Sequence, residues 1–252
     1  MTPEFGSPRT AIVTGGARRI GAAISRALAA DGWQVLIHHH TSDASALAAE
    51  LGAAAVRADL ADPAAAETIV AALAGLPPPA LLVNSAAGFE LDQFEDFTPE
   101  QWDRHMAVNA RAPALLTRAF ARAVPEGQGA LVVNLLDAKL AQPNPDFFTY
   151  TASKMAFAGV TELSARLLAP RGIRVCGIAP SVTLVSGPQT RANFDAVHRL
   201  NALERGVTVE QIVAALRFVI ASPTLTGQTI VLDGGQRFLG LARDVQFLGE
   251  LT

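Results

Sequence analysis

The sequence predicts an α/β protein: a doubly wound parallel sheet of about seven strands, with helices on both faces. Short β-rich runs alternate with Ala- and Leu-rich helical stretches through most of the 252 residues. Most of these runs are nearly continuously apolar, as in strands that are buried on both faces of a parallel sheet. Strict alternation of strand and helix implies right-handed crossovers within one sheet. A chain of this length can bury one core, and we expect a single domain over residues 10–252.

The expected strands are the short, mostly apolar runs Thr10–Thr14, Gln34–His38, Ala54–Ala58, Ala80–Val83, Ala130–Asn134, Arg174–Ile178 and Thr229–Leu232. The expected helices are the longer stretches between them: Ile20–Ala30, Ser42–Leu51, Pro63–Ala74, Pro99–Ala123, Thr151–Ala169 and Val209–Ala221. Residues 181–205 interrupt the alternation with a long, mixed segment after a strand end. A long connection at the carboxyl edge of such a sheet is expected to form a substrate lid.

Composition excludes several other classes of protein. Residues 1–9 lack a basic start and an apolar core, so we expect a flexible leader and not a secretory signal. Charges or prolines interrupt every apolar stretch before it reaches the roughly 18 residues of a membrane helix. The net charge of −3 argues against nucleic-acid binding, and the single cysteine, Cys176, excludes an internal disulfide and a multi-cysteine metal site. We expect a cytoplasmic protein that binds a small-molecule substrate and neither metal, membrane nor nucleic acid.

A glycine-rich segment, Thr14–Gly21, follows the first expected strand and opens the first expected helix. Glycine permits a tight turn and close approach of the backbone to a phosphate, while the helix N-terminus offers N–H groups and a positive dipole. The candidate cofactor residues here are Gly15, Arg18, Arg19, Ile20 and Gly21. The spacing differs from the ordinary dinucleotide fingerprint, and a strand–helix turn without a ligand is the alternative.

The end of the second expected strand favours NADPH over NADH. An NAD-dependent enzyme usually places Asp or Glu there to accept the ribose 2′-hydroxyl. This chain has no acid until Asp43, and its candidate contacts are His38, His40, Thr41 and Ser42. With Arg18 and Arg19 they offer donors to a 2′-phosphate. A solvated strand end is the alternative for each histidine, and a metal site is disfavoured because adjacent strand side chains point to opposite faces.

The third expected strand ends beside another candidate contact with the cofactor. Asp59 lies there, followed by Leu60, and can receive the adenine amino group. An acid that caps a local turn is the equally weighted alternative for Asp59.

Tyr150, the single tyrosine of the chain, lies four residues before Lys154 at the start of an expected helix. Residues four apart share a helix face, so the two side chains should point the same way. A nearby ammonium lowers the pKa of a phenol, which predicts that Tyr150 donates a proton during hydride transfer.

Taken together, these motifs resemble the short-chain dehydrogenase/reductase family in their order along the chain. The resemblance runs from Ala11 to about Phe238 and rests on Thr14–Gly21, Asn84-Ser85-Ala86, Asn109, Tyr150 with Lys154, Pro180 and Asp233-Gly234-Gly235. It implies a Rossmann-type fold with Tyr150 as proton donor, Lys154 on the nicotinamide ribose, and Asn109 kinking a helix and supporting a proton-relay water. It also implies that Asn84, Ala86, Pro180 and Val182 border the cofactor, and that the chain forms dimers or tetramers.

Asp137 stands where most of that family has a serine, thirteen positions before the tyrosine. A carboxylate there would repel the oxyanion of a ketone, whereas a carboxylic acid with a raised pKa can protonate a ring nitrogen. Asp137 and Phe89 resemble the catalytic aspartate and ring-stacking phenylalanine of the pteridine reductase subgroup. That likeness implies substrate contacts from Phe89, Asp137, Tyr150 and Ser181, and 2′-phosphate contacts from Arg19, His40 and Ser42. Departures from the subgroup are Thr41, Ser85 and Ser181. A strand-end cap is the alternative for Asp137, and a core or interface aromatic for Phe89.

Three functions follow from this pattern. The first is an NADPH-dependent reductase of a pterin-type ring such as a dihydropterin or dihydrofolate. The second keeps the fold and cofactor but reduces a ketone or 3-ketoacyl substrate, and the third is an NADP-binding regulatory protein without turnover.

The tail, residues 237–252, carries apolar residues that are costly to expose as a cluster, so we expect it to pack on a partner subunit or close the pocket.

Overall fold

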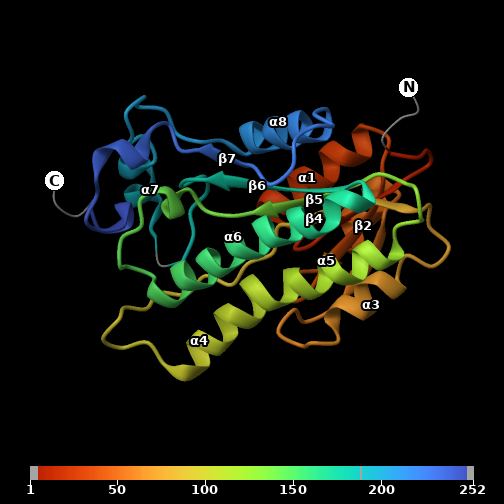
Figure 1. Cartoon of the computed structure of the whole chain (residues 1–252). Coiled ribbons are helices and arrows are strands. Elements are labelled where there is room, and N and C mark those ends of the chain that lie inside the picture. The colour runs from red at the N-terminus through yellow and green to blue at the C-terminus, as the bar shows by residue number, and fades with distance from the viewer. Residues whose placement is uncertain (1–4, 188, 249–252) are drawn as a thin grey trace.

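The computed structural model describes residues 5–187 and 189–248. The strands form one parallel sheet (Figure 1), and their order in it is β3-β2-β1-β4-β5-β6-β7. They are β1 (Thr10–Val13), β2 (Gln34–His39), β3 (Ala54–Arg57), β4 (Pro79–Asn84), β5 (Ala130–Leu135), β6 (Ile173–Pro180) and β7 (Thr229–Leu232). Each lies at its predicted run, which confirms the doubly wound fold.

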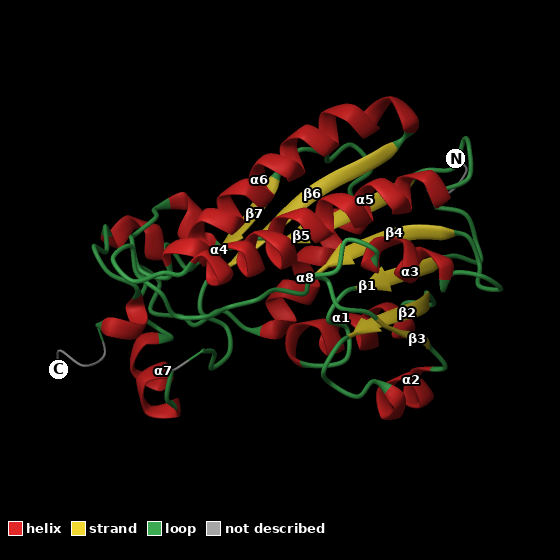
Figure 2. Ribbon diagram, turned by 90° about the horizontal axis from the view of Figure 1, so that it is seen from below, coloured by secondary structure: helices red, strands yellow, loops and turns green. Residues whose placement is uncertain are grey.

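The α-helices of the described residues alternate with these strands and cover both faces of the sheet. They are α1 (Arg19–Ala30), α2 (Ser45–Leu51), α3 (Ala65–Ala71), α4 (Pro99–Met106), α5 (Ala112–Ala123), α6 (Phe148–Leu168), α7 (Arg191–Val197) and α8 (Val209–Ile220). Figure 1 shows α1 and α8 above the sheet and α3, α5 and α6 below it, and Figure 2 views the second group from below.

Consecutive strand residues enter different cores, because successive side chains of a strand point to opposite faces. Ile12 and Leu82 pack in a cluster with residues of α3, α5 and α6. Their neighbours Val13 and Val83 pack in a second cluster with residues of α1, α2 and α8. Burial on both faces explains why these runs are continuously apolar and do not alternate with polar residues.

The pairing of β1 determines where a ligand can bind. β1 pairs with β2 on one side and with β4 on the other, so the strand order reverses between β1 and β4. In an open α/β sheet, ligands bind in the crevice outside the carboxyl ends of the strands at such a reversal. The loops after β1, β2, β4, β5 and β6 therefore surround the expected site.

The structure corrects the predicted continuous helix over Pro99–Ala123. A π-helical turn, Ala107–Arg111, separates α4 from α5. Pro113 lies four residues after Asn109 and has no N–H to donate to its carbonyl, which favours a wider turn at this point. Asn109 was expected to kink a helix, and it lies within this turn.

Residues 5–9 of the expected leader contact the rest of the domain, while residues 1–4 lie outside the described residues. The Phe5 side chain is buried, with its ring centroid 5.6 Å from that of Trp33. The Arg9 guanidinium lies over the Trp33 ring at 4.2 Å. The prediction of a leader considered only whether residues 1–9 resemble a signal peptide, and that gives no information on where the Phe5 ring packs.

Of the described helices, none is long and apolar enough to cross a membrane.

We expect Phe120→Ala to lower the free energy of unfolding by about 3–5 kcal/mol, because it leaves a cavity in a close-packed core. Phe120 on α5 is fully buried in the cluster below the sheet. The matched control is Phe218→Ala on α8, whose side chain is 58% exposed. Urea denaturation measures the free energy of unfolding of both variants. A decrease for Phe120→Ala no larger than that for the control would contradict the packing described.

Candidate active site

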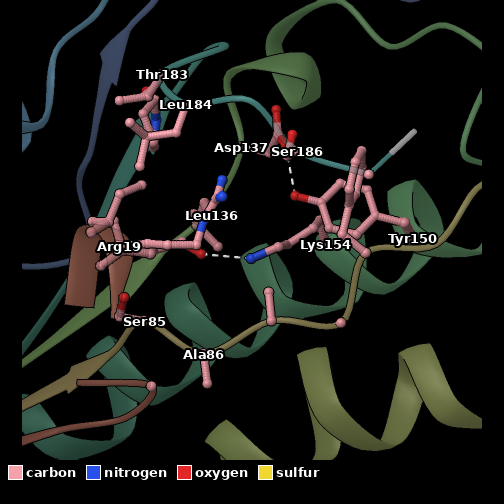
Figure 3. A pocket seen from close by; sticks show the side chains of 18 of the residues that line it. Arg19, Ser85, Ala86, Leu136, Asp137, Tyr150, Lys154, Thr183, Leu184 and Ser186 are labelled. Atoms are coloured by element: carbon pink, nitrogen blue, oxygen red, sulfur yellow. Dashed lines mark hydrogen bonds between the residues drawn. The ribbon is translucent and has the colours of Figure 1, made fainter. Parts of the chain in front are cut away.

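A cavity of ≈ 640 Å³ opens at the carboxyl ends of the strands (Figure 3). Its walls come from the loops after β1, β2, β4, β5 and β6, from α6 and from the C-terminal segment. The expected cofactor contacts that line it are Gly15, Arg18, Arg19, Ile20, Gly21, His38, His40, Thr41, Ser42, Asp59, Leu60, Ala86, Lys154, Pro180 and Val182. The expected catalytic and substrate residues that line it are Phe89, Asp137, Tyr150 and Ser181.

The loop after β1 requires glycine at two positions. Gly15 has φ +61°, and a Cβ there would lie 3.2 Å from the Ala86 Cα. A Cβ on Gly21 would lie 2.1 Å from the Gly15 carbonyl oxygen, so the first turn of α1 can pack on this loop only with glycine. The loop is fixed to its neighbour because Thr14 Oγ1 accepts from the N–H groups of Ser85 and Ala86 at 2.9 and 3.0 Å.

His38 holds this loop and is not a free donor. Its Nδ1 accepts from the Gly15 N–H at 3.2 Å, so its Nε2 donates to the Ala58 carbonyl at 3.1 Å. Burial lowers the pKa of His38 to about 4, which keeps the imidazole neutral. Both ring nitrogens are used by the protein, and this corrects the expectation that His38 donates to a cofactor phosphate.

The turn after β2 presents the remaining donors of this region. His40, Thr41 and Ser42 line the cavity, and the Ser42 carbonyl oxygen lies 2.8 Å from His39 Nδ1. Asp59 accepts from the Ala61 N–H at 2.9 Å, as its turn-capping alternative predicts, and its other oxygen lies 3.9 Å from His40 Nε2.

Arg19 links two of the loops that surround the cavity. Its Nη2 donates to the Val185 carbonyl at 2.8 Å. Arg19 therefore joins the loop after β1 to the loop after β6, beside Thr183 and Leu184 (Figure 3). Arg19 also lines the cavity, and its expected contact with a 2′-phosphate through the other guanidinium N–H groups stays a prediction. The Arg18 side chain makes no hydrogen bond or ion pair with the described residues. Arg18 is exposed.

Two expected site residues, Asn84 and Asn109, stand behind the cavity wall. Asn84 is buried at the end of β4, where its Nδ2 donates to Asn134 Oδ1 at 2.8 Å. Asn109 is buried as well; it donates to the Gly88 carbonyl and to Ser153 Oγ, both at 3.0 Å. Both residues act on the cavity through the segments that they hold, because neither side chain lines it.

Tyr150 and Asp137 meet at the centre of the cavity wall. Tyr150 Oη donates to Asp137 Oδ2 at 2.8 Å, and Asp137 Oδ1 accepts from the Lys139 N–H at 2.8 Å (Figure 3). Burial raises the pKa of Asp137 and, with the charge of Asp137, raises the pKa of Tyr150 well above its usual value. The structure thus corrects the expectation of a lowered phenol pKa: the tyrosine keeps its proton.

Lys154 lies one helical turn after Tyr150 and is buried, although it also lines the cavity. Its Nζ donates to the Leu135 carbonyl at 2.7 Å. Burial lowers the pKa of Lys154 to about 8, while the charge of Asp137 opposes that change. The ammonium lies 5.8 Å from the centroid of the Tyr150 ring, so the two side chains share a face as the spacing predicts.

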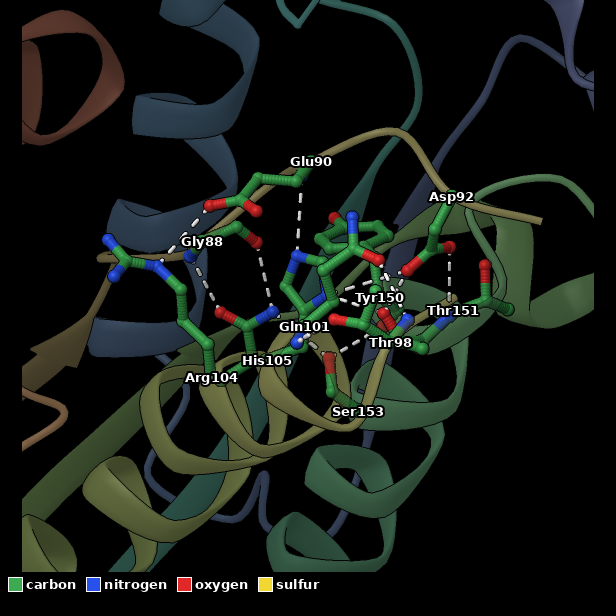
Figure 4. A network of polar contacts seen from close by, with 12 residues as sticks. Gly88, Glu90, Asp92, Thr98, Gln101, Arg104, His105, Tyr150, Thr151 and Ser153 are labelled. Carbon is green, nitrogen blue, oxygen red and sulfur yellow. Dashed lines mark hydrogen bonds and ion pairs between the residues drawn. The ribbon is translucent and has the colours of Figure 1, made fainter. Parts of the chain in front are cut away.

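A buried polar network holds Thr149, the residue before Tyr150. Figure 4 shows its members Asp92 and His105 near Tyr150. Thr149 donates its hydroxyl hydrogen to Asp92 Oδ2, and its N–H to Asp92 Oδ1 at 3.1 Å. The hydroxyl oxygen of Thr149 lies 2.6 Å from His105 Nδ1, and His105 Nε2 accepts from the Glu90 N–H at 3.3 Å. Burial lowers the pKa of His105, and the neutral ring with its hydrogen on Nδ1 satisfies both contacts.

Phe89 belongs to an aromatic cluster at the cavity. Its ring stacks on that of Phe147 with centroids 4.5 Å apart and meets the Tyr150 ring edge-on at 4.8 Å. A Cβ on Gly187 would lie 2.9 Å from the Phe89 ring, so the loop after β6 packs against it. The structure thus combines both alternatives for Phe89, because the ring packs in a cluster and also lines the cavity.

Comparison with known proteins identifies the family. The family model described as enoyl-(acyl carrier protein) reductase matches residues 15–237. D-threitol dehydrogenase of Mycolicibacterium smegmatis is 32% identical, with 90% of this chain and 92% of that protein covered. The chain belongs to the short-chain dehydrogenase/reductase family. These matches confirm the family predicted from the sequence. Members of the family are nicotinamide-dependent oxidoreductases.

The names of two further relatives of this short-chain dehydrogenase/reductase refer to pterin-type substrates. Pteridine reductase 1 of Leishmania tarentolae is 29% identical, with 93% of this chain and 98% of that protein covered. The crystal structure of FolM alternative dihydrofolate reductase 1 from Brucella canis complexed with NADP superposes with a TM-score of 0.88. It is 37% identical, with 93% of this chain and 96% of that chain covered.

Sequence reasoning on this short-chain dehydrogenase/reductase missed the residues that hold the site from behind. Asp92, His105 and Thr149 lie in three separate segments, and no local motif joins them. It also missed the lining residues Asp244 and Gln246. The tail was expected to close the pocket or to pack on a partner, and its described part lines the pocket.

We expect the stability of the protein to fall as pH decreases from 6.5 to about 4 through the titration of His38. The folded-state pKa is about 4 and the ordinary value is 6.5, so the unfolded chain binds the proton first and is favoured by acid. The contribution of His38 is complete above pH 6.5 and falls by up to about 3 kcal/mol at the lower limit.

Denaturant unfolding of His38→Gln across this pH range tests the assignment. The variant should lose this part of the pH dependence, whereas His39→Gln, changed at the neighbouring position, should keep it. Parallel stability curves for the wild type and His38→Gln would refute the role given to the buried imidazole.

Proposed function

We propose that this protein is an NADPH-dependent reductase of a pterin-type ring, such as a dihydropterin or dihydrofolate. The observation that carries the proposal is the hydrogen bond between Tyr150 Oη and Asp137 Oδ2, at 2.8 Å. A carboxyl group replaces the neutral hydroxyl that would stabilise a ketone oxygen. Its raised pKa suits a group that delivers a proton to a ring nitrogen.

The residues of the cofactor end fit NADPH. Gly15 leaves room for close approach of a phosphate, and the first turn of α1 follows it directly. The donors Arg18, His40, Thr41 and Ser42 would contact the 2′-phosphate, because no carboxylate ends β2 to bind a ribose hydroxyl in its place. The NADP in the Brucella canis relative supports this assignment.

The opposite part of the cavity would place the reacting groups. Lys154 would hold the nicotinamide ribose, Ala86, Pro180 and Val182 would border the cofactor, and Phe89 and Ser181 would contact the substrate. When bound, the cofactor would supply a hydride to the carbon of the substrate's C=N bond. Asn109 supports this arrangement indirectly through Gly88 and Ser153.

The chain's own residues supply the proton. Reduction of C=N forms one C–H bond and one N–H bond while the π bond breaks, so the ring nitrogen must gain a proton. The Asp137 carboxyl delivers it, and the hydrogen bond from Tyr150 Oη stabilises the carboxylate that remains. Solvent then restores the proton to Asp137. Because burial keeps the Tyr150 phenol protonated, the tyrosine remains a donor throughout.

We further propose a cytoplasmic homo-oligomer. On α6, Met155, Leu163 and Leu167 follow one another at intervals of eight and four residues and are 47%, 68% and 76% exposed. Residues at this spacing form a stripe along one side of a helix, and an apolar stripe of this kind is typical of a subunit contact.

The decisive experiment compares dihydrobiopterin, dihydrofolate and a 3-ketoacyl substrate as oxidants of NADPH, for the wild type and Asp137→Ser. We expect pterin turnover in the wild type and a loss of about 100-fold in kcat/KM in the variant, since the proton donor is removed. Loss of reduced-nicotinamide absorbance measures both. Ketoacyl turnover that Asp137→Ser preserves or improves would establish a general carbonyl reductase instead, and cofactor binding without any turnover would indicate a regulatory protein.

A second variant tests the support of Tyr150. We expect Asp92→Asn to lower kcat by about tenfold, because it removes an acceptor of Thr149 and loosens the start of α6. The Kd for NADPH should stay near the wild-type value, since Asp92 does not line the cavity. Asp96→Asn, an exposed acid of the same loop, is the matched control. An equal effect on kcat in the two variants would contradict a positioning role for Asp92.

A further inference from the structure

The C-terminal segment, residues 240–248, lies against the loop that precedes α6. Arg243 forms an ion pair with the buried Asp146, and its Nε lies 2.9 and 2.8 Å from the two carboxylate oxygens. The Asp244 N–H donates to the same carboxylate at 2.7 Å. Burial favours the neutral form of Asp146, but the bonds from Arg243 and Asp244 outweigh it and hold the pKa of Asp146 below its usual value.

Three further contacts attach the segment to the same part of the molecule. The ring of Phe247 stacks on that of Phe147, with centroids 6.0 Å apart. Lys139 Nζ lies 3.3 Å from Asp244 Oδ2, and Asn193 Nδ2 donates to the Gln246 carbonyl at 2.9 Å. The segment is thereby fixed between the loop that follows Asp137 and helix α7, at the reacting end of the cavity.

Gln246 is held in this position with an unused acceptor. The residue is 8% exposed, and it lines the cavity. Its Oε1 is buried and, within the described chain, has no hydrogen-bond partner. Asn144 lines the same cavity, and its Oδ1 is likewise buried and unpartnered within the described residues. A buried acceptor without a partner costs free energy, which a ligand that donates to it recovers.

Two donors that line this end of the cavity are already paired within the protein. The Lys139 ammonium already donates to the Asp146 carbonyl at 2.5 Å and faces Asp244. Tyr150 Oη donates to Asp137. A sugar or steroid hydroxyl can donate one hydrogen, whereas an amino group on a planar ring presents two hydrogens in fixed directions.

We propose that Gln246, with Asn144, forms a subsite that binds the N–H donors of an aminated planar heterocycle and so sets substrate specificity. The proposal rests on the proposed function, since it names the part of a pterin that this end of the cavity recognises: its exocyclic amino group and adjacent ring nitrogen. Arg243 and Asp146 are positioning residues, which hold the segment that places Gln246 in the cavity wall.

Pterin and lumazine form a matched pair of ligands for the test, because an exocyclic oxygen in lumazine replaces the amino group of pterin. Equilibrium binding to the NADP⁺-saturated protein, followed by ligand fluorescence, measures the two dissociation constants without requiring turnover. We expect the wild type to bind pterin about tenfold more tightly than lumazine, as one well-formed hydrogen bond predicts.

Two variants of Gln246 separate recognition from a general loss of structure. Gln246→Leu should bring the ratio of the two dissociation constants close to one, whereas Gln246→Glu, which keeps an acceptor, should retain a preference for pterin. Gln34→Leu, at the amino end of β2, is the control and should leave both constants unchanged. A preference that persists in Gln246→Leu, equal binding of the two ligands by the wild type, or binding of neither would overturn the proposal.

The same protein assayed for turnover distinguishes the two proposals. A wild type that prefers pterin over lumazine in a Gln246-dependent way but oxidises no NADPH with any dihydropterin refutes the reductase function and leaves the subsite established. Turnover of dihydrobiopterin without a Gln246-dependent preference refutes the subsite and leaves the reductase function in place.

Discussion

Tyr150, Lys154 and Asp137 carry ionisable groups that the fold withdraws from water, and each needs a partner within the protein. A buried polar group without a partner costs about 1–3 kcal/mol, so their positions are coupled to whatever supplies those partners. Lys154 uses the carbonyl of Leu135 at the end of β5, and Tyr150 uses Asp137 two residues later. The end of β5 and the start of α6 must therefore be held in a fixed relation.

Segments distant in the chain maintain that relation. Asp92 and His105 bind Thr149, and Asn109 joins Gly88 to Ser153 in the first turns of α6. The C-terminal segment acts from the other side through Asp146. These contacts between buried polar groups thus determine the shape of the cavity. The π-helical turn that carries Asn109 is part of this arrangement.

Local patterns predicted the parts of the site whose chemistry is local. The glycines after β1 and the four-residue spacing of Tyr150 and Lys154 reflect constraints within a few residues, and the structure shows both. Arg19, His38 and Asn84 were predicted from their places in motifs. Where their side chains point depends on Val185, Gly15 and Asn134, which lie elsewhere in the fold. The pKa of the Tyr150 phenol was misjudged for the same reason: burial beside Asp137 outweighs the nearby ammonium.

The sequence by itself determined the layered architecture, because strands buried on both faces must be continuously apolar and the helices between them must cover both faces. The order of the cofactor loop, Asp137 and Tyr150 along the chain also indicated the family. Tertiary structure decided which polar atoms are already satisfied and which still face the cavity. That distinction depends on contacts such as the one between Arg243 and Asp146, which are almost 100 residues apart in the sequence. No periodic or local sequence pattern indicates such a contact.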